Sequence, residues 1–246
     1  MIKELGPGLR LMIALTILTG LVYPAAMTGI SKALFPGKAD GSLVTQNGKV
    51  VGSSLIGQSF TKPEYFHPRP SSAGNGYDAT SSSGSNLGPT SAKLLHGTTK
   101  TDDKGKEIVD FDGIEDRIVH YCIDNDIPYT SSSPLDQFKD AQGNLDDVKL
   151  IKAFNDNKTP LVFTPNAQIP ADAVTGSASG LDPHISPANA DLQAARVAKA
   201  RGASPDQVRS LIAEATDKPA LGFIGEPGVN VLLLNVALDQ KFPPRK

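Results

Sequence analysis

The sequence of 246 residues predicts a soluble domain of the α+β (mixed α/β) class behind a single N-terminal transmembrane helix. Residues 11–31 carry no charge, and no later segment has an apolar run of that length. Near the C-terminus, two helices with clear capping signals precede an apolar run typical of a strand. Helices and strands mixed in this order argue against an all-β sandwich.

The uncharged run between Arg10 and Lys32 is long enough to cross a bilayer. Its 21 residues would span roughly 32 Å, because a helix rises about 1.5 Å per residue. A cleaved signal peptide is the alternative, but its apolar region has only about 7–15 residues. Here the apolar character continues to Phe35, and a membrane helix tolerates Pro24. We therefore expect residues 1–35 to form a short cytoplasmic tip and an uncleaved anchor.

Flanking charge does not decide the orientation of this anchor, because each flank holds two basic residues. These are Lys3 and Arg10 before the span and Lys32 and Lys38 after it. Long domains cross a membrane largely regardless of their charge. We therefore expect a cytoplasmic N-terminus and an extracytoplasmic domain over residues 36–246.

Small residues recur four positions apart in the anchor, as Thr16 with Gly20 and as Ala25 with Gly29. This spacing lets a second transmembrane helix pack closely, which predicts a membrane partner beside the lipid bilayer. Small residues are also common in any membrane helix, so an anchor without helix partners stays the alternative.

The domain after the anchor is acidic, with 21 basic and 25 acidic residues and a net charge of −4. A nucleic-acid-binding protein needs a basic surface, so this composition excludes that class. The acidity is concentrated in residues 97–165, which hold 14 acidic and 8 basic residues. Cys122 is the one cysteine, so no intramolecular disulfide forms, and we expect it to be half-buried and structural.

Directly after the anchor, residues 36–47 are expected to form a polar exit from the membrane, and residues 49–56 a short strand. Residues 58–89 are dense in Gly, Pro, Ser and Asn, a composition typical of a flexible linker. Bulky side chains are interspersed there, at Tyr65, Phe66, Tyr77 and Leu87. We therefore expect an ordered, loop-rich layer.

In the acidic segment, apolar spacing predicts helices over residues 114–124 and 148–154 and a strand over residues 161–163.

The C-terminal part has the clearest local signals. Ser186 and Pro187 supply an N-cap and a first helical residue for a helix that ends before Gly202. A capping box that begins at Ser204 opens the next helix. The apolar run over residues 229–238 then predicts a strand.

The sequence predicts no catalytic residue, no metal ligand and no bound cofactor. The four histidines are far apart, so none shares an element with another at metal-ligand spacing. A zinc site assembled from distant residues stays open. Residues 176–180 resemble a nucleophile elbow, but alanine stands where that motif needs serine. Residues 84–88 lack the Gly-Lys-Ser/Thr of a Walker loop.

One polar stretch near the C-terminus holds the candidate contacts for a partner or ligand. Gln193 and Arg196 lie one helical turn apart, where both would present donors to a partner surface. Ser177, Ser179 and Asp182 precede them in a polar turn. The alternative is that these residues only satisfy the turn and a solvated helix face.

Eight blocks of the sequence carry a family resemblance, among them Tyr65-Phe66-His67-Pro68-Arg69-Pro70-Ser71. In order, the blocks are residues 20–24, 52–60, 65–71, 84–87, 177–182, 185–187, 196–201 and 229–239. Together they resemble the KdpC family, the C subunits of Kdp high-affinity potassium-transporting P-type ATPases.

The resemblance implies a non-catalytic accessory subunit in a bacterial inner membrane. In the family, a multi-span partner binds potassium, and a P-type ATPase partner is phosphorylated on aspartate. This chain has no Asp-Lys-Thr-Gly motif, so ATP and potassium would be handled by those partner subunits. The C subunit has been described as a catalytic chaperone that raises the ATPase subunit's affinity for ATP. Because ATP is cytoplasmic and this domain is expected outside, an assembly or extracellular gating role is favoured.

The resemblance implies a shorter connection where this chain has residues 97–165, so this segment is expected to depart from the family pattern. We expect an acidic surface insertion, which could attract cations near a potassium entrance. The alternative to an accessory subunit is a stand-alone, membrane-anchored extracytoplasmic enzyme or binding module.

Overall fold

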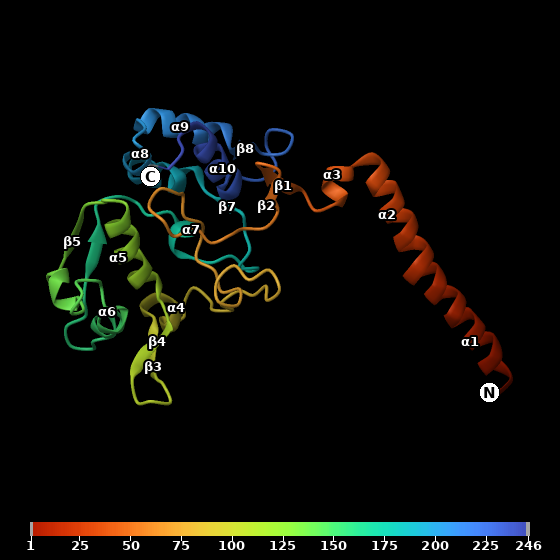
Figure 1. The fold of residues 1–246 in the computed structure, drawn as a ribbon. Coiled ribbons are helices and arrows are strands. Elements are labelled where there is room, and N and C mark those ends of the chain that lie inside the picture. The colour runs from red at the N-terminus through yellow and green to blue at the C-terminus, as the bar shows by residue number, and fades with distance from the viewer. Residues whose placement is uncertain (1, 245–246) are drawn as a thin grey trace. The chain divides into compact units, whose positions relative to one another are not determined.

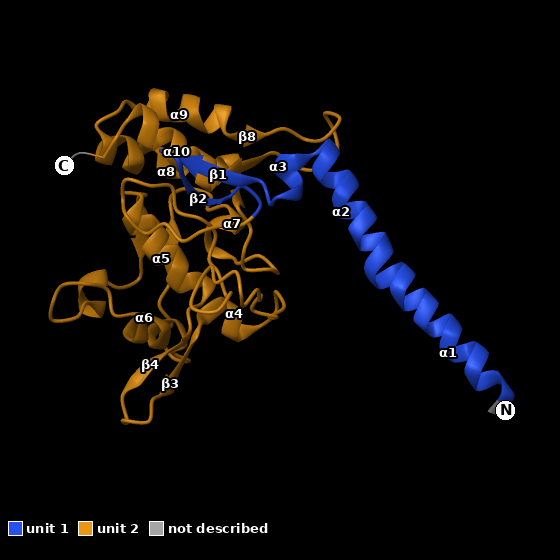
Figure 2. Cartoon of the chain, turned by 45° about the vertical axis from the view of Figure 1, so that its right-hand side comes forward, with its two compact units in different colours: residues 1–55 blue, residues 56–246 orange. Residues whose placement is uncertain are grey.

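The computed structural model describes residues 2–244, so Met1, Arg245 and Lys246, which the predicted anchor and domain include, lie outside the described residues. The chain divides into two compact units, residues 1–55 and residues 56–246 (Figure 2). The boundary between the units lies after a hairpin that follows the anchor.

The first unit consists of one long helix followed by a short helix and a hairpin (Figure 1). Its elements are α1 (Ile2–Ile17), the π-helical turn η1 (Leu18–Val22), α2 (Tyr23–Leu34), α3 (Pro36–Ala39), β1 (Leu43–Gln46) and β2 (Lys49–Ser53). Within the described residues, Lys3–Leu34 is the one helix long and apolar enough to cross a membrane. None of its central apolar residues is buried within the chain.

The sequence does not predict strand β1, because this strand lies within residues 36–47, which were expected to form a polar exit from the membrane. It pairs with β2 in antiparallel register through a two-residue turn, Asn47-Gly48. Both turn residues have positive φ, 52° and 76°. A tight hairpin turn of this kind favours Asn-Gly, because these residues adopt the left-handed region at low cost. The Asn47-Gly48 dipeptide is therefore the sequence signal for this hairpin, although the polar residues around it do not resemble a strand.

The second unit is an α+β domain, as predicted. Its first elements are α4 (Ala92–His96), β3 (Thr98–Thr101), β4 (Glu107–Phe111), α5 (Ile114–Asp124), β5 (Tyr129–Ser131), the 3-10 helix η2 (Leu135–Phe138), α6 (Asp147–Phe154) and β6 (Phe163–Pro165). The remainder are α7 (Ala171–Val174), β7 (His184–Ile185), α8 (Pro187–Arg201), α9 (Pro205–Glu214), β8 (Thr216–Asp217), β9 (Gly228–Asn230) and α10 (Val231–Lys241). The strands form the antiparallel pairs β3–β4 and β5–β6 and an antiparallel sheet in the order β7-β9-β8.

Most predicted helices of this unit are confirmed, and the caps explain their bounds. Ser186 Oγ accepts a hydrogen bond from the Asn189 N–H, and Gly202 ends α8 in the left-handed conformation. Ser204 and Gln207 form both bonds of the capping box of α9. Cys122 on α5 is fully buried rather than half-buried, and burial raises the pKa of its thiol to about 11.

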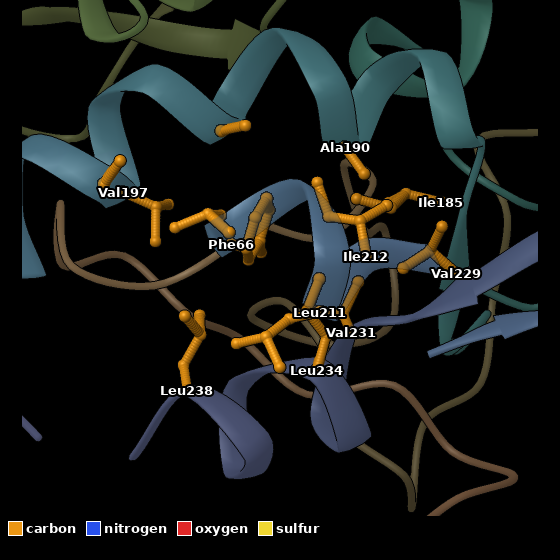
Figure 3. Packing of buried hydrophobic residues seen from close by; sticks show 13 residues of the cluster. Phe66, Ile185, Ala190, Val197, Leu211, Ile212, Val229, Val231, Leu234 and Leu238 are labelled. Carbon is orange, nitrogen blue, oxygen red and sulfur yellow. The ribbon is translucent and has the colours of Figure 1, made fainter. Parts of the chain in front are cut away.

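The larger core cluster lies among α8, α9, α10 and the small sheet, with Phe66 inserted from the loop-rich segment (Figure 3). Its buried members are Phe66, Ile185, Ala190, Ala194, Val197, Ala198, Val208, Leu211, Ile212, Val229, Val231, Leu234 and Leu238. A smaller cluster forms within the acidic segment, from Val119, Leu135, Leu150, Phe154 and Leu161. The expected loop-rich layer is confirmed, because its Phe66 and Ala73 are fully buried without regular secondary structure.

The predicted strand over residues 229–238 is wrong beyond its first two residues. The chain leaves β9 at Asn230 and continues as α10, because the Asn230 side chain accepts a hydrogen bond from the Leu233 N–H at 3.1 Å and caps a helix. Nearly every residue of the run is apolar, so its pattern fits both the strand and the helix periods. Asn230, a residue that favours the N-cap position, is the sequence signal that indicates a helix here and not a strand.

Exchange of Leu234 for alanine is predicted to lower the free energy of unfolding by about 2–5 kcal/mol, because a fully buried leucine leaves a cavity. The neighbouring Leu233→Ala is the control, since Leu233 keeps 39 % of its surface exposed. Thermal unfolding of the full chain in detergent, followed by circular dichroism, compares the two variants. Equal losses for both would contradict the burial of Leu234 and the exposure of Leu233.

Candidate functional site

Gln193 and Arg196 point into the second unit, with only 1 % and 8 % of their surfaces exposed. Gln193 Oε1 accepts from the His67 N–H at 2.7 Å, and Nε2 donates to the His67 carbonyl at 3.1 Å. Arg196 Nη1 donates to the carbonyls of Pro63 and Tyr65 at 2.6 and 2.9 Å. The prediction that both present donors to a partner surface therefore fails, because the loop-rich layer covers this face of α8.

Two further side chains hold the same loop. Asn235 on α10 accepts from the Phe66 N–H at 2.9 Å and donates to the Phe66 carbonyl at 3.0 Å. Arg201 Nε donates to the Glu64 carbonyl at 2.8 Å, and Nη1 pairs with the Asp239 carboxylate at 2.8 Å. We call Gln193, Arg196, Arg201 and Asn235 the loop clamp. It replaces the hydrogen-bond partners that a strand neighbour would supply.

Asp182 joins the loop-rich layer at a second place. Its Oδ2 pairs with Arg69 Nη1 at 2.8 Å, and its Oδ1 accepts from the His184 N–H at 2.9 Å. Burial acts to raise the pKa of this carboxyl, but the hydrogen bonds from His184 and the charge of Arg69 outweigh it and lower the pKa. Asp182 therefore serves as a charged structural link within the chain.

Ser177 and Ser179 close the turn that precedes Asp182. Ser177 Oγ accepts from the Gly180 N–H at 2.9 Å, and Ser179 Oγ accepts from the Leu181 N–H at 3.1 Å. The Ser179 carbonyl also accepts from the Ser83 N–H at 3.0 Å. Both hydroxyls thus stabilise the turn, while a partner contact by their exposed sides stays a prediction.

The π-helical turn η1 contains Gly20 and separates Thr16 from Ala25 and Gly29. Pro24 has no N–H for the carbonyl four residues earlier, and the helix widens just before it. In an unbroken α-helix Ala25 would lie about 180° around from Thr16, and one inserted residue reduces this to about 80°. A Cβ added at Gly20 or Gly29 meets no atom within 4 Å. The packing role of these residues stays a prediction.

A polar cleft of about 460 Å³ lies between α5 and the loop-rich layer. Its acidic lining residues are Asp112, Asp116, Asp124 and Asp147, and its basic and imidazole residues are Arg69, Arg117, His67 and His120. Gln193 of the loop clamp also lines it. The cleft is therefore built from the acidic segment on one side and from the clamped loop on the other.

Three groups that could ligate a metal ion meet in this cleft. Asp116 and His120 lie one turn apart on α5, and Asp147 begins α6. Their ligand atoms all lie within 4.8 Å of one another, and this is the one such cluster found among residues 2–244. Asp116 and His120 are four residues apart on a helix that the sequence predicts correctly, a ligand spacing that the histidines by themselves do not reveal. Asp147 is 27 residues further on, so only tertiary packing reveals it.

The three residues of this cluster differ in their hydrogen bonds and in the pKa shifts that follow from them. His120 Nε2 lies 2.8 Å from Asp147 Oδ1, and this hydrogen bond raises the pKa of the imidazole. Asp116 is 2 % exposed, and its Oδ1 has no hydrogen-bond partner. Burial, helped by repulsion from Asp147, raises the pKa of Asp116 to about 7.

Comparison with known proteins finds one family over nearly the whole chain. The family model for KdpC, described as the c chain of a K+-transporting ATPase, matches residues 5–138 and 139–240. A potassium-transporting ATPase KdpC subunit of Caulobacter vibrioides is 44% identical over 245 residues, covering 99% of this chain and 96% of the relative. Subunits of the same name from Mycobacterium tuberculosis and Beijerinckia indica are each 42% identical, over 238 and 243 residues. They cover 97% and 99% of this chain and 98% and 96% of their own lengths.

Replacement of Asn235 by leucine is predicted to cost about 2–6 kcal/mol of unfolding free energy, because the buried Phe66 N–H and carbonyl both lose their partner. The control is Gln240→Leu, the same kind of exchange at an exposed position of α10. Denaturation of the full chain in detergent measures both. A loss no larger than that of the control would show that the clamp does not hold the loop.

Proposed function

This chain belongs to the KdpC family of K+-transporting ATPase c chains, and from that premise we propose that it is a non-catalytic accessory subunit of an ATP-driven potassium-uptake complex. The observation that carries the proposal is the family match, which spans both the anchor and the domain. The relatives are named as subunits of a potassium-transporting ATPase, which supports a role in potassium transport.

The partners we propose are a multi-span subunit that binds potassium and a P-type ATPase subunit that hydrolyses ATP. The absence of an Asp-Lys-Thr-Gly motif from the sequence supports this division, since the chain lacks the aspartate motif that such an ATPase phosphorylates. Any effect on the ATPase subunit's affinity for ATP would then act through protein contacts. Assembly or stabilisation of the two partners is the role that a single-helix subunit with a large domain serves best.

The chain is anchored in a membrane by its N-terminal helix. Apolar side chains cover that helix all round, including Leu11, Ile13, Leu18 and Leu21, each about half exposed or more. In water this surface would be costly, so lipid or partner helices cover it. We propose the bacterial inner membrane, with the N-terminus in the cytoplasm and the domain outside, because long domains translocate largely regardless of flanking charge.

A stand-alone, membrane-anchored binding module is the second candidate, and the polar cleft is the observation that favours it. Such a module would be purified from its own membranes without partners. An accessory subunit would bring a P-type ATPase and a potassium-binding subunit with it.

Exchange of Gly20 or Gly29 for leucine is predicted to reduce recovery of both partners severalfold in a pull-down of the tagged full chain from native membranes. The chain itself leaves open space beside both glycines, so a loss reports a neighbouring helix rather than internal strain. Mass spectrometry of the detergent eluate measures the recovery.

The control for Gly20→Leu is Ala14→Leu, which adds nearly the same bulk about 160° around the helix from Thr16. Unchanged recovery with both glycine variants would remove these residues from the partner contact. Absence of the ATPase from the wild-type eluate would instead contradict the subunit assignment and favour the stand-alone module.

A further inference from the structure

The cluster of Asp116, His120 and Asp147 combines a helical pair with a third ligand from another helix. The i, i+4 spacing on α5 places the first two side chains on one face. Asp147 Oδ1 lies 2.8 Å from His120 Nε2, and all three ligand atoms lie within 4.8 Å of one another. A transition-metal ion with bonds of about 2.0–2.2 Å holds its ligand atoms roughly 3.0–3.6 Å apart, so small side-chain rotations would bring the three groups to a bound geometry.

A second, independent observation is the missing partner of Asp116. Its carboxyl is buried, and Oδ1 receives no hydrogen bond. The adjacent Arg117 does not supply one, because its guanidinium binds the Asp112 carboxylate at 2.8 and 2.9 Å and the Val174 carbonyl at 3.0 Å. A buried carboxylate without a partner is costly, and such groups in native proteins are normally paired or bound to metal.

The polar cleft supplies access to this carboxylate. His120 and Asp147 keep 40% and 44% of their side chains exposed, and all three residues line the cleft. Asp112 and Asp124 line the same cleft and add negative charge to it. The cleft has room for water molecules, which complete the coordination of an ion held by three protein ligands.

From this geometry we infer that Asp116, His120 and Asp147 form a binding site for a divalent first-row transition-metal ion. Two carboxylate oxygens and one imidazole nitrogen suit Zn²⁺ or Mn²⁺, whereas potassium and magnesium favour sites made of oxygen alone. The ion would take the place of the hydrogen between His120 and Asp147 and would supply the missing charge beside Asp116. It would also link α5 to α6 within the acidic segment.

The test is a titration of Zn²⁺ into the full-length chain in detergent micelles, after removal of metal with EDTA and dialysis, at pH 7.5. Isothermal calorimetry is expected to show one saturable site per chain, and Asp116→Asn and Asp147→Asn are each expected to weaken it at least tenfold. The thiol of Cys122 does not compete, because it is buried.

A matched control is His96→Gln. His96 Nδ1 lies 2.7 Å from Glu115 Oε2, a pair much like His120 with Asp147 but without a third carboxylate in the described cluster. Its exchange is expected to leave the affinity for Zn²⁺ unchanged. His184, which lies between Asp182 and Asp217, provides a second control as His184→Gln.

The Asp116→Asn variant also separates binding from folding. It keeps the shape of the side chain and removes an unpaired buried charge, so its melting temperature without metal should equal or exceed that of the wild type. Zn²⁺ should raise the melting temperature of the wild type and not that of this variant. The inference would be overturned if the wild type showed no saturable binding, if the Asp116 and Asp147 variants bound as tightly as the wild type, or if either control lost binding.

Discussion

The backbone of the loop-rich layer is the constraint on which the second unit depends. Between β2 and α4 the chain forms no helix or strand, yet it passes through the core at Phe66. Buried N–H and carbonyl groups must find partners, and here side chains supply them. Gln193 and Asn235 each bind the N–H and the carbonyl of one residue, as a neighbouring strand would. Phe66 can therefore enter the core without an unsatisfied backbone.

The same clamp connects the core to the polar cleft. Gln193 holds His67, and both residues line the cleft opposite α5. On the other side, Tyr121 donates to Asn189 Oδ1 at 2.7 Å, and Arg196 Nε donates to Asn125 Oδ1 at 3.0 Å. The acidic segment is thus attached to α8 by buried polar bonds rather than by a shared apolar core. Its interpretation as an insertion stays a prediction.

Two buried charged residues, Arg201 and Asp116, differ in how their charge is compensated within the chain. Arg201 is fully buried, but it is offset by Asp239 and stacks over the Tyr65 ring at 4.6 Å. Asp116 has no comparable partner, although Asp112 and Arg117 are close in sequence. Apart from Arg201 Nη2, Asp116 Oδ1 is the one buried side-chain polar atom without a hydrogen bond among the described residues, and the proposed metal ion would supply its partner. Asp116 lies in the segment with the greatest excess of negative charge.

The sequence by itself determined the anchor, the two capped helices after Ser186 and the family. These depend on signals that are local, such as an uncharged run, a capping box and a proline at the first helical position. Only the tertiary structure decided that Gln193 and Arg196 face inward. A polar residue on a helix is expected to be exposed, and the sequence does not show that a distant loop covers it. The tertiary structure also decided that Asp147 meets Asp116 and His120, since α5 and α6 come together by packing across 22 intervening residues of sequence. Contacts of this kind depend on which surfaces bury one another, and no local pattern encodes that choice.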